Sequence, residues 1–140
     1  MIYLDTSVIV AYYCPESMSL RAQYLLQEHV KPALSFLTEV EFASAVAKKV
    51  RQNELDGVDG KRILAKFTSH VDAGLFRIIP VEKHHWQLAR GWIDILTTPL
   101  RTLDALHLAI ASSEELQLVT SDKLFYHAAE MLDLDARLLV

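Results

Sequence analysis

The sequence predicts an α/β protein: a three-layer α/β/α sandwich around a central, mostly parallel sheet of four or five strands. Short apolar segments alternate with longer segments whose apolar residues recur at helical spacing, a pattern typical of parallel sheets. The chain has 140 residues, of which 51% are hydrophobic, with only 4 Gly and 4 Pro. This composition suits a sizeable buried core. The sequence contains no repeat, low-complexity tract or long linker, so we expect residues 1–140 to form a single domain.

Caps and helix breakers divide the first half of the chain. Thr6 and Ser7 are candidate caps after a first apolar strand, and Pro15 stops the helix that they open. Ser17 or Ser19 starts the next helix, which Pro32 cannot continue. Helical spacing returns twice before Gly74, with a polar turn between. We expect strands at 2–4 and 33–36, helices at 6–13, 17–30, 38–52 and 61–72, and a turn at 53–60.

The second half continues the alternation. Pro80 closes a strand at 76–79, and a helix over 82–96 ends at the breaker Thr97-Thr98-Pro99. The helix at 103–111 is apolar nearly all round, as in a helix buried on most sides, yet it contains Asp104 and His107. We further expect a strand at 118–120, a helix at 122–132 and an edge strand at 137–140.

Composition excludes several classes of protein. The single cysteine, Cys14, cannot form an internal disulfide, and no zinc pattern is present, so a reducing cytoplasm is the expected location. The N-terminus lacks the basic region of a signal peptide, and no apolar run reaches the roughly 18 residues of a membrane span. The net charge of -4 opposes nucleic-acid binding; however, setting aside four acids as cation ligands leaves 14 acidic against 14 basic residues.

Four acidic residues stand at the starts of predicted helices. Asp5 and Asp122 each follow a strand directly, Glu41 begins the helix after another strand, and Asp104 lies in the first turn of the apolar helix. In an open parallel sheet, the carboxyl ends of strands and the N-termini of the following helices share one edge, where ligands bind. We therefore expect the four carboxylates to converge.

Capping explains each acid when it is taken alone. Asp5 and Asp122 suit N-cap positions, Thr38 and Glu41 have the spacing of a capping box, and Asp104 suits a helix dipole. Convergence favours another explanation, because carboxylates within about 4–6 Å of each other repel unless they are protonated or neutralised by a cation. An all-oxygen site suits Mg²⁺ or Mn²⁺, which retain bound waters, one of which can become an attacking nucleophile.

Four segments of the chain resemble, in order and spacing, the PIN-domain nucleases, and among them the VapC toxins of type II toxin-antitoxin systems. These segments are Tyr3–Ser7, Leu37–Glu41, Leu103–Ala109 and Thr120–Asp122. The resemblance covers essentially the whole chain. It implies Mg²⁺- or Mn²⁺-dependent hydrolysis of RNA, a cognate antitoxin that blocks the site, and metal binding and catalysis by Asp5, Glu41, Asp104 and Asp122.

Several neighbouring residues are secondary candidates. Thr6 and Thr120 are placed to orient a carboxylate or a bound water, although capping and strand-end hydrogen bonds explain them equally well. Glu39 competes with Glu41 but lies about 200° around the helix from it. His107 follows Asp104 by three residues, so we expect an Asp104–His107 hydrogen bond.

Partners and rival functions remain open at this point. The aromatic residues exceed what the core requires, which favours a homodimer and a groove for an antitoxin segment; they are Tyr12, Tyr13, Trp86, Trp92, Phe125 and Tyr126. One rival is an aspartate-dependent phosphatase, although that type carries an Asp-x-Asp pattern and Ser7 occupies its third position here. The other rival is a non-catalytic RNA- or protein-binding module on the same scaffold.

Overall fold

The computed structural model describes residues 1–140 and has a five-stranded sheet in the order β3-β2-β1-β4-β5, with every strand pair parallel. The strands are β1 (Ile2–Leu4), β2 (Ala33–Ser35), β3 (Arg77–Ile79), β4 (Gln117–Thr120) and β5 (Ala136–Leu138). The helices are α1 (Thr6–Tyr13), α2 (Ser19–Glu28), α3 (Phe36–Arg51), α4 (Gly57–Asp72), α5 (Lys83–Ile93), α6 (Thr102–Ser113) and α7 (Lys123–Met131). None of the helices has the length and apolarity that crossing a membrane requires.

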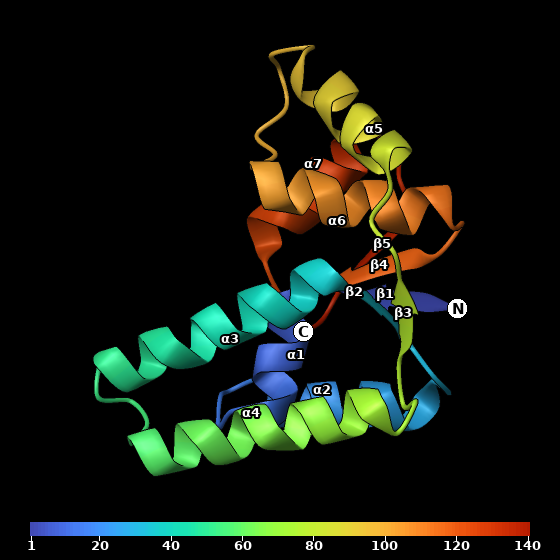
Figure 1. Ribbon diagram of the computed structural model, residues 1–140. Coiled ribbons are helices and arrows are strands. Elements are labelled where there is room, and N and C mark those ends of the chain that lie inside the picture. Colours follow the sequence, from blue (N-terminus) through green and yellow to red (C-terminus); the bar gives the residue numbers. More distant parts are fainter.

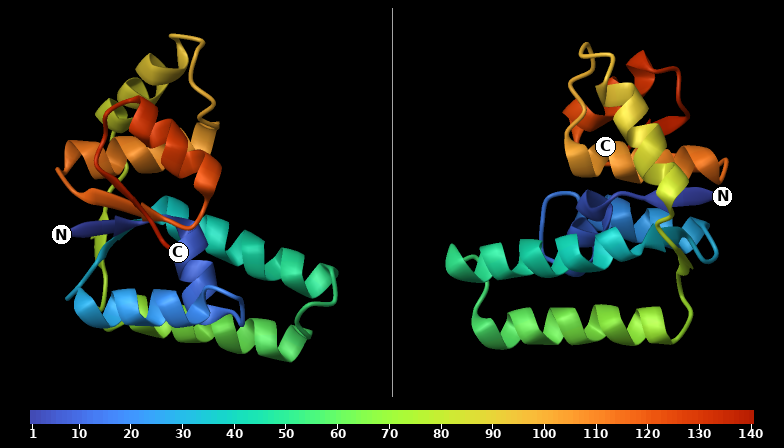
Figure 2. Two further views of the ribbon diagram at one scale, coloured as in Figure 1. Left: turned by 180° about the vertical axis from the view of Figure 1, so that it is seen from behind. Right: turned by 45° about the horizontal axis from the view of Figure 1, so that its top comes forward.

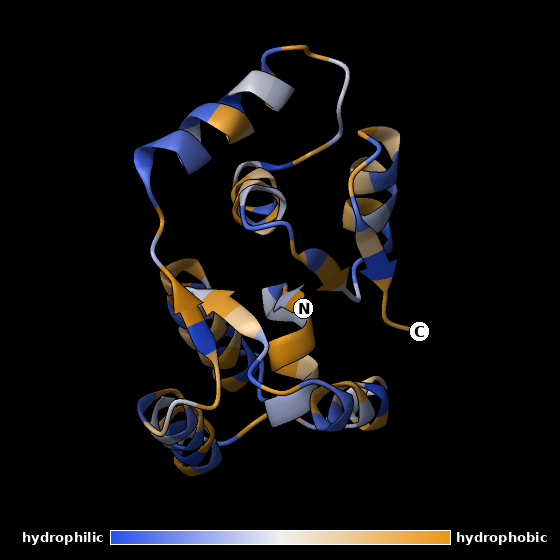
Figure 3. Ribbon diagram, turned by 90° about the vertical axis from the view of Figure 1, so that its right-hand side faces the viewer, coloured by the Kyte–Doolittle hydropathy of each residue, from blue (hydrophilic) through white to orange (hydrophobic).

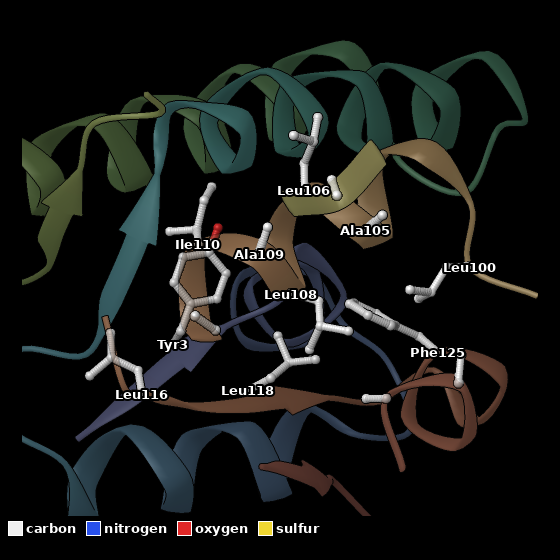
Figure 4. Close-up of a cluster of buried hydrophobic side chains, with 14 of the residues drawn as sticks. Tyr3, Leu100, Ala105, Leu106, Leu108, Ala109, Ile110, Leu116, Leu118 and Phe125 are labelled. Atoms are coloured by element: carbon white, nitrogen blue, oxygen red, sulfur yellow. The ribbon is translucent and has the colours of Figure 1, made fainter. Parts of the chain in front are cut away.

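Helices cover both faces of the sheet, which confirms the predicted sandwich. The layer of α1–α4 lies on one face and the layer of α5–α7 on the other (Figures 1 and 2). Strand side chains alternate between two separate cores: Tyr3 packs with α5–α7, whereas Ile2 and Leu4 pack with α1–α4. Strand residues are mostly apolar in Figure 3, as expected for strands buried on both faces. Figure 4 shows the core that contains Tyr3.

The order of the strands defines where a ligand site is expected. The chain runs from β1 outward through β2 to β3, then returns to the other side of β1 to form β4 and β5. The direction of winding therefore reverses between β1 and β4. In open α/β sheets, the crevice at the carboxyl ends of the strands flanking such a reversal is the usual binding site. Asp5 and Ser121 are the first residues beyond β1 and β4.

Several element boundaries differ from the prediction. Helix α3 begins at Phe36, because Ser35 and Thr38 form its capping box, and the expected strand end is shortened accordingly. Helix α4 begins at Gly57, within the expected turn, because the Asp56 carboxylate caps it by accepting a hydrogen bond from the Asp59 backbone. The expected edge strand forms one residue earlier, as β5, after Asp133 adopts a left-handed φ of 54°, a conformation that Asp tolerates better than most residues.

Two helical glycines provide a matched stability test. A Cβ atom at Gly60 would lie 2.9 Å from Cγ2 of Val50, whereas a Cβ at Gly91 meets nothing within 4 Å. We expect Gly91→Ala to stabilise the protein by about 0.5–1 kcal/mol through helix propensity. Gly60→Ala should instead cost about 1 kcal/mol, because the branched Val50 side chain must move. Urea denaturation measures both, and equal shifts of the same sign would contradict the steric argument.

Candidate active site

Asp5 is held at the end of β1 by hydroxyl groups. Its Oδ2 accepts hydrogen bonds from Ser7 Oγ (2.7 Å) and Thr120 Oγ1 (2.8 Å). Asp5 occupies the N-cap position of α1, but its side chain caps no backbone amide there. The backbone explains its placement, because the Asp5 N–H donates to the Val119 carbonyl and so extends the β1–β4 pairing. Capping was the chief alternative explanation for this carboxylate, and it does not account for it.

Asp122 both caps a helix and faces a neighbouring side chain. Its Oδ1 accepts hydrogen bonds from the backbone amides of Leu124 (2.9 Å) and Phe125 (3.2 Å) at the start of α7. Its Oδ2 lies 2.9 Å from Nη2 of Arg101. One oxygen thus caps α7, and the other pairs with Arg101.

Asp104 lies in the first turn of α6, with its side chain only 15% exposed. Arg101 Nε donates to its Oδ2 at 3.0 Å. Burial nevertheless raises the pKa of Asp104, and the negative charge of Asp5 raises it further, so the arginine compensates only in part. This carboxylate is therefore close enough to Asp5 to be destabilised by it in the absence of another cation.

A guanidinium lies between two of the acids. Arg101 precedes α6 and contacts Asp104 through Nε and Asp122 through Nη2. These two contacts raise the pKa of Arg101, chiefly through the hydrogen bond to Asp104. The Arg101 side chain is 72% exposed, so solvent screens both of its ion pairs. Positive charge thus stands where two separate segments of the chain present carboxylates.

Glu41 reaches the same region from the second turn of α3, not from the start of a helix as predicted. The predicted Thr38–Glu41 capping box is wrong, because Ser35 pairs with Thr38 instead. Glu41 Oε1 accepts hydrogen bonds from Thr6 Oγ1 (2.8 Å) and His107 Nε2. Burial alone would raise the pKa of Glu41, but the hydrogen bonds from His107 and Thr6 outweigh burial and lower it. This acid is therefore stabilised as a carboxylate.

The predicted hydrogen bond between Asp104 and His107 is absent, and that prediction is wrong. His107 is fully buried, and its Nδ1 lies 2.6 Å from the Tyr3 hydroxyl while Nε2 faces Glu41. Helical spacing identifies which residues of α6 are neighbours but not which side of the helix faces β1 and α3. Asp104 turns to Arg101 instead.

The family is decided by comparison along the chain. A profile of the PIN domain matches residues 2–131. The chain belongs to the PIN-domain family. No curated protein is a significant match for the sequence.

Several solved structures resemble this chain over most of their length. One is VapC20 of Mycobacterium tuberculosis, titled a Sarcin-Ricin loop cleaving toxin, with 16% identity, a TM-score of 0.75, and 91% and 95% of the two chains covered. Another is FitAcB of Neisseria gonorrhoeae, with 24% identity, a TM-score of 0.72, and 97% and 96% covered. VapBC2 of Rickettsia felis, bound to a promoter DNA fragment, has 19% identity, a TM-score of 0.69 and full coverage of both chains. These likenesses establish a shared fold.

Hydroxyl groups donate hydrogen bonds to two of the acids of this PIN domain. Thr6 and Thr120, the two secondary candidates, each donate to one acid: Thr6 to Glu41 and Thr120 to Asp5. Sequence reasoning missed Ser7, which donates to Asp5 and accepts a hydrogen bond from the Ser121 backbone at 3.0 Å. Its position two residues after a strand-end aspartate was the available signal. The rival Glu39 forms none of these hydrogen bonds.

Hydrogen bonds and charge relate the four acids to one another or to neighbouring segments. Arg101 joins Asp104 to Asp122, the charge of Asp5 acts on Asp104, and Thr6 joins Glu41 to the segment after β1. As their side chains stand, no three His, Cys, Asp or Glu residues are arranged to coordinate a single ion. The structure therefore brings the four segments together around the β1–β4 reversal, with a guanidinium between two of the carboxylates.

Proposed function

We propose that this PIN domain is a metal-dependent endoribonuclease that hydrolyses RNA phosphodiester bonds and acts as the toxin of a toxin-antitoxin pair. The observation that carries the proposal is the placement of acidic side chains from four segments around the carboxyl ends of β1 and β4; they are Asp5, Glu41, Asp104 and Asp122. Carboxylates gathered at the carboxyl ends of parallel strands, with one guanidinium between two of them, suit a cation and, through it, a phosphate.

The donor set fits Mg²⁺ or Mn²⁺. The proposed ligands Asp5, Glu41, Asp104 and Asp122 offer only carboxylate oxygens, which these hard ions prefer. The Arg101 guanidinium acts as a stand-in cation between Asp104 and Asp122. Burial, and after it the charge of Asp5, raises the pKa of Asp104 despite the contact with Arg101. When bound, the ion supplies Lewis-acid polarisation of a phosphate and a water of lowered pKa.

The chain's own residues then orient the reacting groups. Ser7 and Thr120 both hydrogen bond to Oδ2 of Asp5, and Thr6 bonds to Oε1 of Glu41, so each acid keeps its second oxygen free of these hydroxyls. Fixing carboxylates in this way reduces the entropy lost when they bind a ligand. If a cation took its place beside Asp104 and Asp122, the exposed Arg101 would be available to contact an RNA phosphate.

We also propose a cognate antitoxin and a homodimer in the cytoplasm. Related folds include a toxin-antitoxin complex from Klebsiella pneumoniae, with a TM-score of 0.66. Of the aromatic residues expected at interfaces, Phe125 is buried in the core, whereas Trp86 is 51% exposed. Val40 and Leu124, which lie one and two residues from Glu41 and Asp122 in the sequence, are also exposed, and exposed apolar side chains of this kind can serve a protein partner.

The alternative functions receive less support. In the phosphatase alternative, an Asp-x-Asp pair would use its second carboxylate near the first, but Ser7 occupies that position and donates its hydroxyl proton to Asp5. A non-catalytic module has no need for a buried, charge-destabilised Asp104, because an apolar or amide residue there would be more stable.

Incubation of purified protein with RNA and with a phosphomonoester, each with Mn²⁺ and with chelator, tests the function. We expect RNA cleavage that requires Mn²⁺ and no hydrolysis of the monoester. Cleavage of the monoester alone would favour the phosphatase. Absence of RNA cleavage by protein free of antitoxin, across diverse cellular RNAs, would contradict the ribonuclease proposal.

The exposed arginine gives a further prediction. Arg101→Gln should tighten Mn²⁺ binding by about two- to fivefold, because an exposed charge contact worth roughly 0–1 kcal/mol no longer competes with the cation. Isothermal titration calorimetry measures the affinity. Lys123→Gln is the matched control, because Lys123 is an exposed cation next to Asp122 in sequence that forms none of the ion pairs at the acids. Unchanged or weaker binding by the Arg101 variant would contradict the competition.

A further inference from the structure

A buried chain of polar groups lies behind Glu41. His107 on α6 contacts Glu41 through Nε2 and the Tyr3 hydroxyl through Nδ1, at 2.6 Å. The Tyr3 hydroxyl also lies 2.9 Å from Oγ of Ser35. His107, Tyr3 and Ser35 are all fully buried. Figure 4 shows the Tyr3 ring rising from β1 into the core against α6. These hydrogen-bonded polar groups therefore link β1, β2, α6 and α3 beneath the proposed active site.

The hydrogen-bonding capacities of the groups give this chain a direction. A carboxylate only accepts hydrogen bonds, so Nε2 of His107 carries a proton and donates it to Glu41 Oε1. In the neutral ring Nδ1 is then an acceptor, and the Tyr3 hydroxyl donates to it. The Ser35 hydroxyl in turn donates to the Tyr3 oxygen. Each group in this series of hydrogen bonds has a complementary partner. The series, which runs from Ser35 on β2 to Glu41, therefore fixes a single tautomer of the His107 imidazole.

The pattern of contacts on Glu41 indicates what this order achieves. Both side-chain hydrogen bonds, from Thr6 and from His107, end on Oε1, and neither uses Oε2. The Glu41 side chain is 25% exposed while His107 is fully buried. One carboxylate oxygen is thus anchored on the protein side, and the other is left for a ligand. Any buried histidine needs hydrogen-bond partners for its ring nitrogens. Burial alone does not require that one of these partners be an acid of the proposed site, as Glu41 is for His107.

We propose that His107 is a positioning residue of the nuclease, which aims Glu41 at the cation through Nε2, while Tyr3 fixes the imidazole ring through Nδ1. This inference rests on the proposed metal-dependent function and assigns a role that the four acids alone do not provide. Partners behind a metal-binding group commonly contribute about 10- to 100-fold in metal affinity or activity.

Two amide substitutions at position 107 separate the two ring nitrogens. The amide nitrogen of glutamine reaches approximately the Nε2 position, whereas the asparagine amide reaches only the Nδ1 position. We expect His107→Asn to weaken Mn²⁺ binding about 10- to 100-fold, and His107→Gln to stay within a few-fold of wild type. Free Mn²⁺ measured by electron paramagnetic resonance gives the affinity, and urea denaturation shows that both variants are folded.

A second buried histidine is the matched control. His85 of α5 is 1% exposed, and its Nδ1 accepts a hydrogen bond from the Glu82 backbone rather than contacting an acid of the site. His85→Asn and His85→Gln should change stability without changing Mn²⁺ affinity. Equal affinities for His107→Asn and His107→Gln in folded protein would overturn the positioning role while leaving the nuclease proposal intact. No Mn²⁺ binding or cleavage by wild-type protein would overturn both.

A spectroscopic readout is independent of metal and of activity. Long-range ¹H–¹⁵N correlation spectra of the metal-free protein should show His107 protonated at Nε2 and unprotonated at Nδ1. Tyr3→Phe should shift the Nδ1 resonance, because it removes the donor to that atom, and should leave the His85 signals unchanged. A proton on Nδ1 of His107 would reverse the direction of the chain and overturn the proposal.

Discussion

Asp104→Asn should lower the rate of metal-dependent RNA cleavage by about a hundredfold to a thousandfold, the loss typical when one electrostatic contact to a transition state is removed. The amide keeps the shape of the side chain but removes the charge that attracts the cation. Cleavage at saturating Mn²⁺ and at limiting Mn²⁺ separates loss of affinity from loss of rate. Cleavage as fast as that of wild type would exclude Asp104 from the site.

The same substitution should stabilise the protein without metal. Burial and the charge of Asp5 raise the pKa of Asp104, so the folded state holds this proton more tightly than the unfolded chain does. The ionised carboxylate therefore destabilises the fold, and its cost grows as pH rises through the window that begins near the unfolded value of 3.8. We expect Asp104→Asn to melt higher than wild type at pH 7, and the difference to shrink toward pH 3.

Glu39 provides the matched control for charge removal. Glu39 lies on α3 two residues before Glu41 and has no hydrogen bond within the acid site. Glu39→Gln should leave cleavage unchanged, whereas Glu41→Gln should lower it. If the two variants behave in the opposite way, the assignment of the α3 ligand is wrong.

The architecture was predictable because it depends on patterns that the backbone imposes. The alternation of short apolar runs with segments of helical periodicity predicted all five strands of the sheet and all seven helices of the two layers that cover it. Boundaries were less predictable where two caps compete. Thr38 is spaced for a box with Glu41, yet it pairs with Ser35, because the chain leaves β2 directly into α3 and Ser35 is already at the turn.

The partners within the site were less predictable than its members. The sequence named Asp5, Glu41, Asp104 and Asp122, and strand order explains why their segments meet. It assigned His107 to Asp104 from their three-residue spacing, but β1 and α3 lie against the other side of α6 and bind His107 instead. Contacts between residues separated by 104 positions, such as Tyr3 and His107, depend on how layers pack, and no local pattern encodes them.

The largest stability effect is expected at the helix that carries Glu41. Phe42 is fully buried, with ring centroids 4.7 Å from Phe67 and 5.6 Å from Tyr13. Phe42→Ala should cost about 3–5 kcal/mol of unfolding free energy, through lost burial and the cavity left between α1, α3 and α4. Phe36→Ala, on the same helix where the ring is 59% exposed, should change stability by less than about 0.5 kcal/mol.

Urea denaturation of the two variants therefore tests the packing of α3. Since Glu41 immediately precedes Phe42 on α3, loss of this anchor should also loosen the Glu41 carboxylate and weaken Mn²⁺ binding in the fraction that stays folded. If Phe42→Ala unfolded at the same urea concentration as Phe36→Ala, the aromatic cluster would not be what holds α3 against α4. The placement of Glu41 beside Thr6 and His107 would then need another source of rigidity.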